Sequence, residues 1–205
     1  RLDVRPVGMH RILLAALALA LTACGASDAP PAPYTTVPIL PFLGEAVMGQ
    51  AAAPVEVIEY ASTTCGHCKA FHDGVLPDLK TKYIDTGKAK LVYRVMPTPP
   101  PELAMAGAAI ARCAGEAKYF AVIDDLFKSQ DNLLSAARQP RRLQRRLSEL
   151  GGRHGLSADE VGTCIDDDAL HKHSMDVARS APSSITSTPS FIVNGKDVDE
   201  NTLEA

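Results

Sequence analysis

The sequence has no Trp and only five Phe and five Tyr in 205 residues. Without a row of aromatic side chains, it has no platform on which bases could stack. Positive charge is not in excess, because 21 Lys and Arg stand against 24 Asp and Glu and the net charge is −3 at pH 7. No basic field is available to attract a phosphate backbone, and we predict no nucleic-acid partner. The 46% hydrophobic and 22% charged residues are ordinary for a folded soluble protein with one globular domain.

The N-terminal region lacks a hydrophobic run long enough to cross a bilayer. Its apolar stretch, residues 12–21, has about ten residues, whereas a transmembrane helix needs roughly twenty. The stretch follows His10 and Arg11 and is typical of a signal-peptide core. It ends in Leu-Thr-Ala before Cys24, which resembles a bacterial lipobox. We therefore predict a lipoprotein signal peptide at 1–24, lipidation of Cys24 and a membrane-anchored protein in the periplasm. An ordinary signal peptide with a chance cysteine at its end is the alternative.

The segment after Cys24 is rich in proline. Five prolines between positions 30 and 41 exclude a helix or a central strand there. We predict that residues 25–46 form an extended tether between the membrane and the folded domain.

The five cysteines are an odd number, which needs an explanation in an exported protein. If Cys24 is acylated, four remain, and Cys65 and Cys68 form a CxxC pair. Cys113 and Cys164 can then pair only with each other, so we predict a structural disulfide between them. Two unrelated buried thiols are the alternative, because free Cys is common in protein interiors.

The CxxC has rival interpretations that its surroundings disfavour. A structural zinc site needs a second pair of ligands, and the sequence has no other CxxC. A c-type haem site needs His directly after Cys68, where Lys69 stands instead. The histidines at 154, 171 and 173 form no convincing ligand set, so we predict no metal and no cofactor. A redox site remains, with one thiol exposed at a helix N-terminus and the other one turn behind it.

The order of the expected elements supports this interpretation. β-branched and aromatic residues predict strands at 55–61 and 89–95, and apolar spacing predicts a helix over 65–85 that Pro77 kinks. From 102 to 180 the pattern is helical, with a capping box that begins at Ser157. Strand signals return at 190–193, and Asn194-Gly195 predicts a hairpin turn. A βαβ unit, a helical insert and a hairpin predict an α/β thioredoxin fold, with the thioredoxin-fold domain at 47–97 and 181–205 and the helical insert at 98–180.

The chain resembles the DsbA-like branch of the thioredoxin superfamily over residues 47–205. The motifs that carry the resemblance are Glu-Tyr-Ala-Ser at 59–62, Cys-Gly-His-Cys at 65–68, Phe-His at 71–72 and Thr-Pro-Ser-Phe-Ile-Val-Asn-Gly at 188–195. The resemblance implies an enzyme, a protein thiol–disulfide oxidoreductase. It also implies a nucleophilic Cys65, a buried resolving Cys68, a cis-proline at Pro189 preceded by Thr188, and a buried acid at Glu59 that handles the proton of Cys68.

Several of these residues have simpler alternatives. Glu59 could be a partly exposed strand carboxylate, Pro189 an ordinary trans turn proline and His67 an exposed loop residue. At the active site, His67 would add positive charge or a hydrogen-bond donor beside Cys65. His72 is expected on the helix surface.

The sequence departs from the family in two places. Gly66 stands where many DsbA-like proteins have Pro, and Gly-His is the dipeptide typical of protein disulfide isomerases. The family pattern also continues into a packing C-terminal helix, which is expected beyond residue 205.

The leading hypothesis is an exported enzyme that oxidises thiols of substrate proteins, with a membrane redox partner that restores its disulfide and a lipid anchor in the membrane. The alternatives are a disulfide reductase or isomerase, or a non-catalytic protein that binds a soft metal such as Cu(I) through the CxxC.

Overall fold

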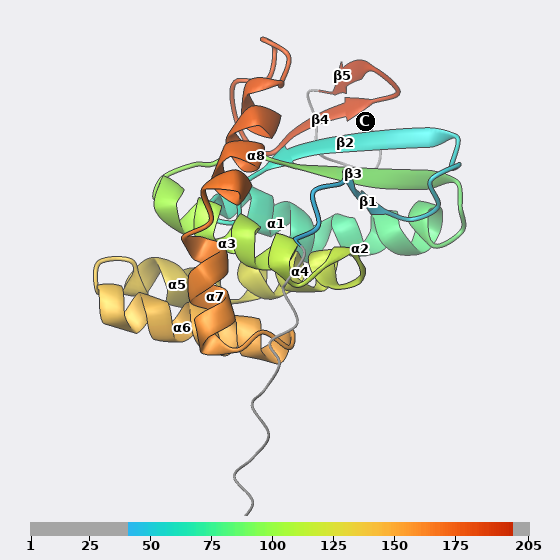
Figure 1. The fold of residues 1–205 in the computed structure, drawn as a ribbon. Coiled ribbons are helices and arrows are strands. Elements are labelled where there is room, and N and C mark those ends of the chain that lie inside the picture. Colours follow the sequence, from blue (N-terminus) through green and yellow to red (C-terminus); the bar gives the residue numbers. More distant parts are fainter. Residues whose placement is uncertain (1–40, 199–205) are drawn as a thin grey trace, which may run out of the picture. The chain divides into compact units, whose positions relative to one another are not determined.

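The strands form one five-stranded mixed sheet, and most of the helices lie below it in Figure 1. The structure, a computed structural model, describes residues 41–198. Strand order is β1-β3-β2-β4-β5, and only the central pair β2 and β3 is parallel. The strand bounds are β1 Ala46–Met48, β2 Val55–Ala61, β3 Ala89–Val95, β4 Ser190–Val193 and β5 Lys196–Val198.

The crossover between β2 and β3 is helical but broken. It contains α1 Gly66–Gly74, α2 Leu76–Leu79 and a π-helical turn at Lys80–Ile84. The prediction of one kinked helix over 65–85 was wrong in this respect. Pro77 lies in the first turn of α2, where a missing N–H costs no helical bond, so the chain restarts a helix there instead of bending one.

The remaining helices lie between β3 and β4 in sequence, as the helical pattern predicts. They are α3 Pro101–Cys113, a 3₁₀ turn at Glu116–Lys118, α4 Tyr119–Lys128, α5 Gln130–Ala136, α6 Pro140–Arg153, α7 Ala158–Ile165 and α8 Asp168–Arg179. The predicted capping box is present, because Ser157 and Glu160 bond each other's backbone N–H groups at the start of α7. The fold class is therefore confirmed as an α/β thioredoxin fold with an inserted set of helices.

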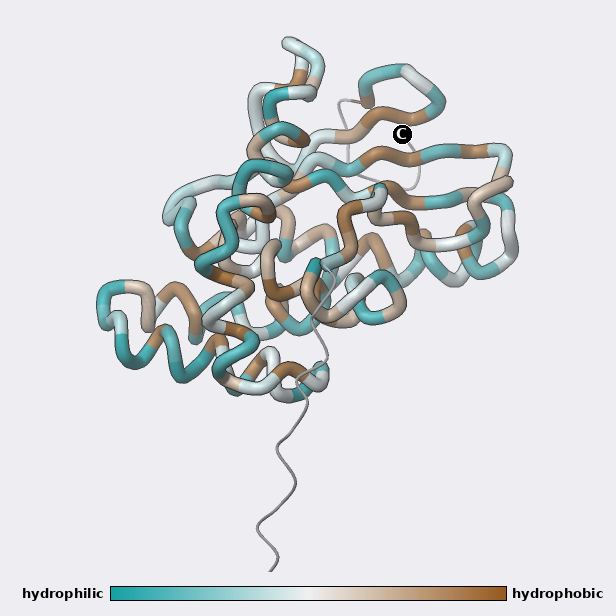
Figure 2. Tube along the Cα trace, viewed as in Figure 1, coloured by the Kyte–Doolittle hydropathy of each residue, from teal (hydrophilic) through white to brown (hydrophobic). Residues whose placement is uncertain are grey.

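The main hydrophobic core lies between the sheet and these helices. Helix α3 is buried from Leu103 to Cys113 and is rich in alanine, which lets neighbouring elements approach it closely. At Gly107 an added Cβ would lie 3.1 Å from Leu126 of α4 and 3.2 Å from the Thr63 hydroxyl. In Figure 2 hydrophobic residues (brown) recur along both the strands and the helices, and buried ones from both form the core. Helix α3 thus packs closely against α4 and against the turn that precedes α1.

Part of the predicted tether belongs to the folded domain. Phe42 N–H donates to the carbonyl of Arg112 at 2.9 Å, and the ring of Phe42 contacts Tyr119 edge-on. β1 begins at Ala46, the last position of the predicted tether, and pairs with β3. The predicted signal peptide, the predicted lipidation site Cys24 and the predicted tether up to residue 40 lie outside the described residues.

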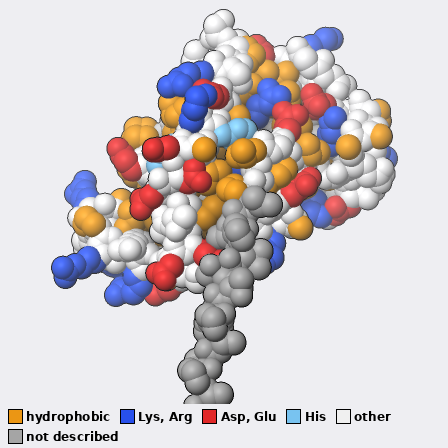
Figure 3. Space-filling view, in the orientation of Figure 1, with side chains coloured by type: hydrophobic (Ala, Val, Ile, Leu, Met, Phe, Trp, Pro, Cys, Tyr) orange, Lys and Arg blue, Asp and Glu red, His pale blue; other side chains and the backbone are white. Residues whose placement is uncertain are grey.

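The surface carries both signs of charge. On the face shown in Figure 3, Lys and Arg side chains are interspersed with Asp and Glu, as the small net charge leads one to expect. Among residues 41–198, no helix is both long and apolar enough to cross a membrane.

Candidate active site

Cys65 is the N-cap of α1, at the C-terminal end of the central strand β2. Its backbone is extended (φ −88°, ψ 124°), and its sulfur accepts a hydrogen bond from Cys68 N–H at 3.5 Å. Cys65 is partly exposed and Cys68 is fully buried. Both thiols are free, so the structure describes the dithiol form. The free N–H groups of a helix start favour a negative charge, so Cys65 is placed to carry a thiolate.

The two thiols have opposite acidities. Burial raises the pKa of Cys65, but hydrogen bonds from the Thr188 side chain and from the Cys68 and His67 backbone outweigh it, and the pKa is lowered overall. Burial also raises the pKa of Cys68, and the hydrogen bonds from the Ser62 backbone and the Thr188 side chain are too weak to offset it, so this pKa lies far above that of an ordinary thiol. Cys65 is therefore the more acidic thiol of the pair, and Cys68 is the less acidic one.

The loop before β4 lies beside Cys65. The Thr188–Pro189 peptide bond is cis, and the Cys65 thiol donates to the Thr188 carbonyl oxygen at 3.3 Å. His67 is exposed and lines a groove of ≈ 530 Å³ together with the loop. The hydroxyl residues of this groove are Ser184, Thr186, Ser187, Thr188 and Ser190. An extended peptide could therefore reach Cys65 along a polar wall.

Glu59 and His72 form a buried pair beneath the sheet. His72 Nε2 lies 3.1 Å from each carboxylate oxygen of Glu59, which is fully buried. The prediction of His72 on the helix surface was wrong, because the residue is only 8% exposed and its ring packs against that of Phe127 of α4 at 4.1 Å between centroids. Tyr93 lies near this pair, and its pKa is raised by burial first and by the charge of Glu59 second.

A further residue of the site, Gln130, carries no recognisable sequence signal. It lies on α5, is 3% exposed and donates from Nε2 to the carbonyl oxygens of Thr63 and Cys65, at 2.9 and 3.0 Å. A polar residue within a helical pattern usually faces water, so only the fold could place it here.

The other two cysteines lie in the helical region. Cys113 at the end of α3 and Cys164 in α7 form a disulfide with a Cα–Cα distance of 6.3 Å. No group of three or more potential metal ligands occurs in the part of the chain that the structure describes.

Comparison with known proteins gives the family. The thioredoxin family model matches residues 43–205, about four fifths of the sequence. The chain belongs to the thioredoxin family. A Rickettsia bellii protein that bears the name protein-disulfide oxidoreductase is 31% identical over 162 residues, which are 78% of this chain and 60% of the relative. The chain thus spans less than two thirds of the length of this curated relative.

Solved structures agree with the DsbA-like assignment within this thioredoxin family. Wolbachia pipientis alpha-DsbA1 is 30% identical, with a TM-score of 0.67 and coverage of 80% of this chain and 82% of that one. A Novosphingobium aromaticivorans structure described as a protein-disulfide isomerase also has a TM-score of 0.67, with coverage of 80% of this chain and 92% of that one. Its identity to this chain is 21%, so it supports the fold alone. The predicted DsbA-like family is confirmed, and these relatives support the expected enzyme class, a thiol–disulfide oxidoreductase.

Proposed function

We propose that this thioredoxin-family protein catalyses thiol–disulfide exchange at Cys65 and Cys68, and that it oxidises thiols of exported proteins. The observation that carries the proposal is the contrast between the two thiols at one helix end. Cys65 is accessible with a lowered pKa, whereas Cys68 is buried with a raised pKa. Because the thiolate is both the nucleophile and the better leaving group, this contrast makes Cys65 the sulfur that exchanges with substrates.

In the oxidising direction, a substrate thiolate attacks the Cys65 sulfur of the Cys65–Cys68 disulfide. That bond breaks, a mixed disulfide forms and Cys68 leaves as a thiolate that takes up a proton. A second substrate thiolate then attacks the substrate sulfur of the mixed disulfide, so Cys65 leaves as a thiolate and the substrate gains a disulfide. The two electrons stay on the dithiol until a separate acceptor removes them, for which a membrane redox protein is the expected partner.

Stabilisation of the Cys65 thiolate favours the oxidising direction. Whatever stabilises the thiolate stabilises the reduced protein, and a more stable reduced form makes the disulfide a stronger oxidant. The groove beside the cis-proline loop provides a surface for an extended substrate chain next to the reactive sulfur.

An isomerase is the second candidate, and the Gly66-His67 dipeptide between the cysteines favours it. The reduction potential separates the two. The reduction potential is about −120 mV for strong oxidants, about −180 mV for isomerases and about −270 mV for thioredoxin.

The proposal is tested with a reduced, unfolded substrate protein that needs a disulfide to regain activity. The oxidised protein should speed recovery, and Cys65→Ser should abolish the effect. A potential near that of thioredoxin, or recovery that is unchanged by Cys65→Ser, would contradict an oxidase.

We further propose that Cys24 is lipidated and anchors the domain at the periplasmic side of a membrane. Stable anchoring needs more than one acyl chain, which a lipoprotein-type modification supplies. Expressed in a bacterium with the lipoprotein pathway, the protein should fractionate with membranes and Cys24→Ala should not. A soluble mature chain with an unmodified N-terminus would refute the anchor.

A further inference from the structure

Gln130 links the inserted helices to the residue that carries the reactive thiol. Its side-chain N–H₂ group has two hydrogens, and its nitrogen lies within hydrogen-bond distance of two carbonyl oxygens, those of Thr63 and Cys65. The side chain is buried, so these bonds form out of water, where a lost partner is costly. Both carbonyls belong to the turn between β2 and α1, 65 and 67 residues away in sequence.

The same turn is fixed from its other side by hydroxyl groups. The hydroxyls of Ser62 and Thr64 are 2.9 Å apart, and Ser62 Oγ accepts from Thr98 N–H at 3.2 Å. Thr64 Oγ1 donates to the Thr98 carbonyl at 2.8 Å. The turn is thus bonded to the loop after β3 on one side and to α5, through Gln130, on the other.

The carbonyl of Cys65 has a double role in this arrangement. It accepts the first hydrogen bond of α1, from Lys69 N–H at 3.1 Å, and it also accepts from Gln130. A peptide unit is planar and rigid, so an anchored carbonyl also fixes the N–H group on the far side of the same unit. That N–H group belongs to Gly66, and the N–H groups of the next two residues of α1, His67 and Cys68, lower the pKa of the Cys65 thiol.

The side-chain N–H groups of Gln130 also neutralise part of the negative charge on the carbonyl oxygens of Thr63 and Cys65, near the Cys65 sulfur. With Gln130 removed, these oxygens would be less compensated and freer to reorient, and both changes disfavour a nearby anion. We propose that Gln130 is a positioning residue that stabilises the thiolate of Cys65 and thereby makes the Cys65–Cys68 disulfide more oxidising. The inference rests on the proposed redox function of the CxxC and deepens it, because it assigns part of the redox poise to the inserted helices.

The test replaces Gln130 with Met, which is similar in size and has no N–H donor. Gln139→Met is the matched control, because Gln139 is exposed at the start of α6 and its side chain makes no cap hydrogen bond. Two quantities are measured: the titration of the Cys65 thiolate in a Cys68→Ser background, and the equilibrium of the intact CxxC with glutathione.

In Gln130→Met we expect the Cys65 titration to move to higher pH. We also expect the glutathione equilibrium to shift about three- to tenfold toward the protein disulfide, where tenfold corresponds to about 30 mV. Gln139→Met should change neither quantity. Gln130→Asn keeps the amide on a shorter side chain and should fall between wild type and Gln130→Met.

A lower free energy of unfolding in Gln130→Met with both redox quantities unchanged would overturn the inference, since a purely structural role predicts that result. If Gln130→Met does not fold, Gln130→Asn decides by the same two measurements. Neither measurement uses a protein substrate. A wild-type protein that fails to oxidise substrates therefore refutes the proposed function, whereas an unshifted titration and potential refute the role of Gln130.

Discussion

At the scale of single residues, the position of a sulfur atom relative to α1 decides its acidity. Cys65 lies at the helix start and Cys68 one turn inside, buried from water. In Cys68→Ser, the remaining thiol should therefore titrate at lower pH in the folded protein than in the same variant unfolded in urea. In Cys65→Ser, the remaining thiol should titrate at higher pH when folded. Ultraviolet thiolate absorbance measures both, and equal midpoints in folded and unfolded protein would exclude the thiolate mechanism.

The Glu59–His72 pair predicts a characteristic pattern of stability. Because both side chains are buried, His72→Phe leaves the Glu59 carboxylate without its partner and should lower the free energy of unfolding by about 3 kcal/mol. The double variant Glu59→Leu/His72→Phe removes both polar groups and should recover most of that loss. Urea unfolding of the two single variants and the double variant measures the coupling. Additive losses would mean that the two side chains are not coupled.

Residues found by local pattern and residues found only by the fold differ in a physical way. Cys65, Cys68 and the Thr188-Pro189 pair are recognisable because short motifs specify their chemistry. The environment of His72 depends on Phe127, 55 residues further along the chain, which covers the ring. No sequence period reports such a contact, so the helix-surface prediction failed.

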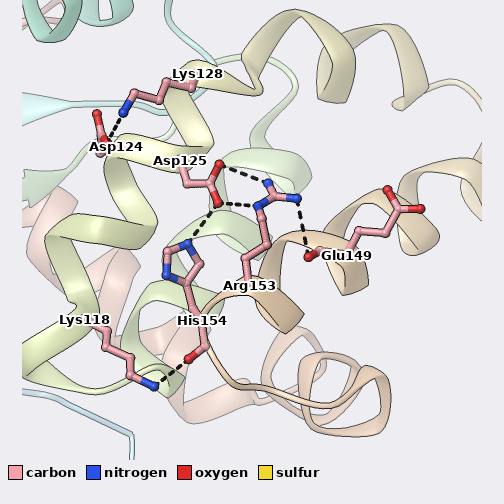
Figure 4. A network of polar contacts seen from close by, with 7 residues as sticks. All are labelled: Lys118, Asp124, Asp125, Lys128, Glu149, Arg153 and His154. Carbon is pink, nitrogen blue, oxygen red and sulfur yellow. Dashed lines mark hydrogen bonds and ion pairs between the residues drawn. The ribbon is translucent and has the colours of Figure 1, made fainter.

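At the scale of elements, one polar network joins α4 to the end of α6 (Figure 4). Asp125 accepts from Arg153 Nε and Nη2, at 2.8 and 3.0 Å, and its Oδ2 lies 3.0 Å from His154 Nε2. Burial raises the pKa of Asp125, but the bonds from Arg153 and His154 outweigh it and lower the pKa overall. A carboxyl with a lowered pKa in the folded state stabilises the fold above its unfolded pKa of about 3.9, and this is lost as the pH falls through the folded value.

Asp125→Asn should therefore lower the free energy of unfolding by about 1 kcal/mol at neutral pH, since the partners are partly solvated. The difference from wild type should shrink as the pH falls below about 4. Among residues 41–198 the neighbouring Asp124 pairs only with exposed Lys128 on its own helix, so Asp124→Asn should cost a few tenths of a kcal/mol at most. An Asp125→Asn effect that does not depend on pH would contradict the charge-based account.

The disulfide between α3 and α7 closes a loop with a sequence separation of 51 residues. The chain-entropy model assigns about 4 kcal/mol of stability to a loop of this size. The double variant Cys113→Ala/Cys164→Ala should lose stability of this order in urea, while its CxxC potential stays unchanged. A changed potential would mean that the bridge, and not only the turn contacts, controls the active site.

The elements themselves were predictable to different degrees. Both parallel strands were predicted with their observed bounds, because each is rich in β-branched and aromatic residues. Strand β1 was missed, since three residues cannot show a period, and its pairing with β3 decides its conformation. Helix α5 follows α4 after a single residue, Ser129, so no composition change marks the corner on which Gln130 lies.

At the scale of the whole molecule, redox state and folding stability are two sides of one thermodynamic cycle. The disulfide of an oxidant forms with difficulty in the folded protein because the folded dithiol is comparatively stable. Cys65 stabilises the folded dithiol through its lowered pKa, because each pKa unit is equivalent to about 1.4 kcal/mol. Cys68 contributes nothing at neutral pH, because it is protonated in both the folded and the unfolded chain.

The reduced protein should therefore resist urea better than the oxidised protein at neutral pH. The sign of the pH dependence follows from the lowered pKa of Cys65: its contribution is fully present above the unfolded thiol pKa of about 8.5 and is lost as the pH falls through the folded value. The difference between the reduced and oxidised urea curves should shrink on acidification. Cys65→Ser, which can form no CxxC disulfide, should show the same urea curve with and without reductant, provided that the reductant leaves the buried Cys113–Cys164 bridge intact. If the oxidised form proves more stable than the reduced form at neutral pH, folding favours the disulfide instead of the dithiol. The protein would then be a reductase.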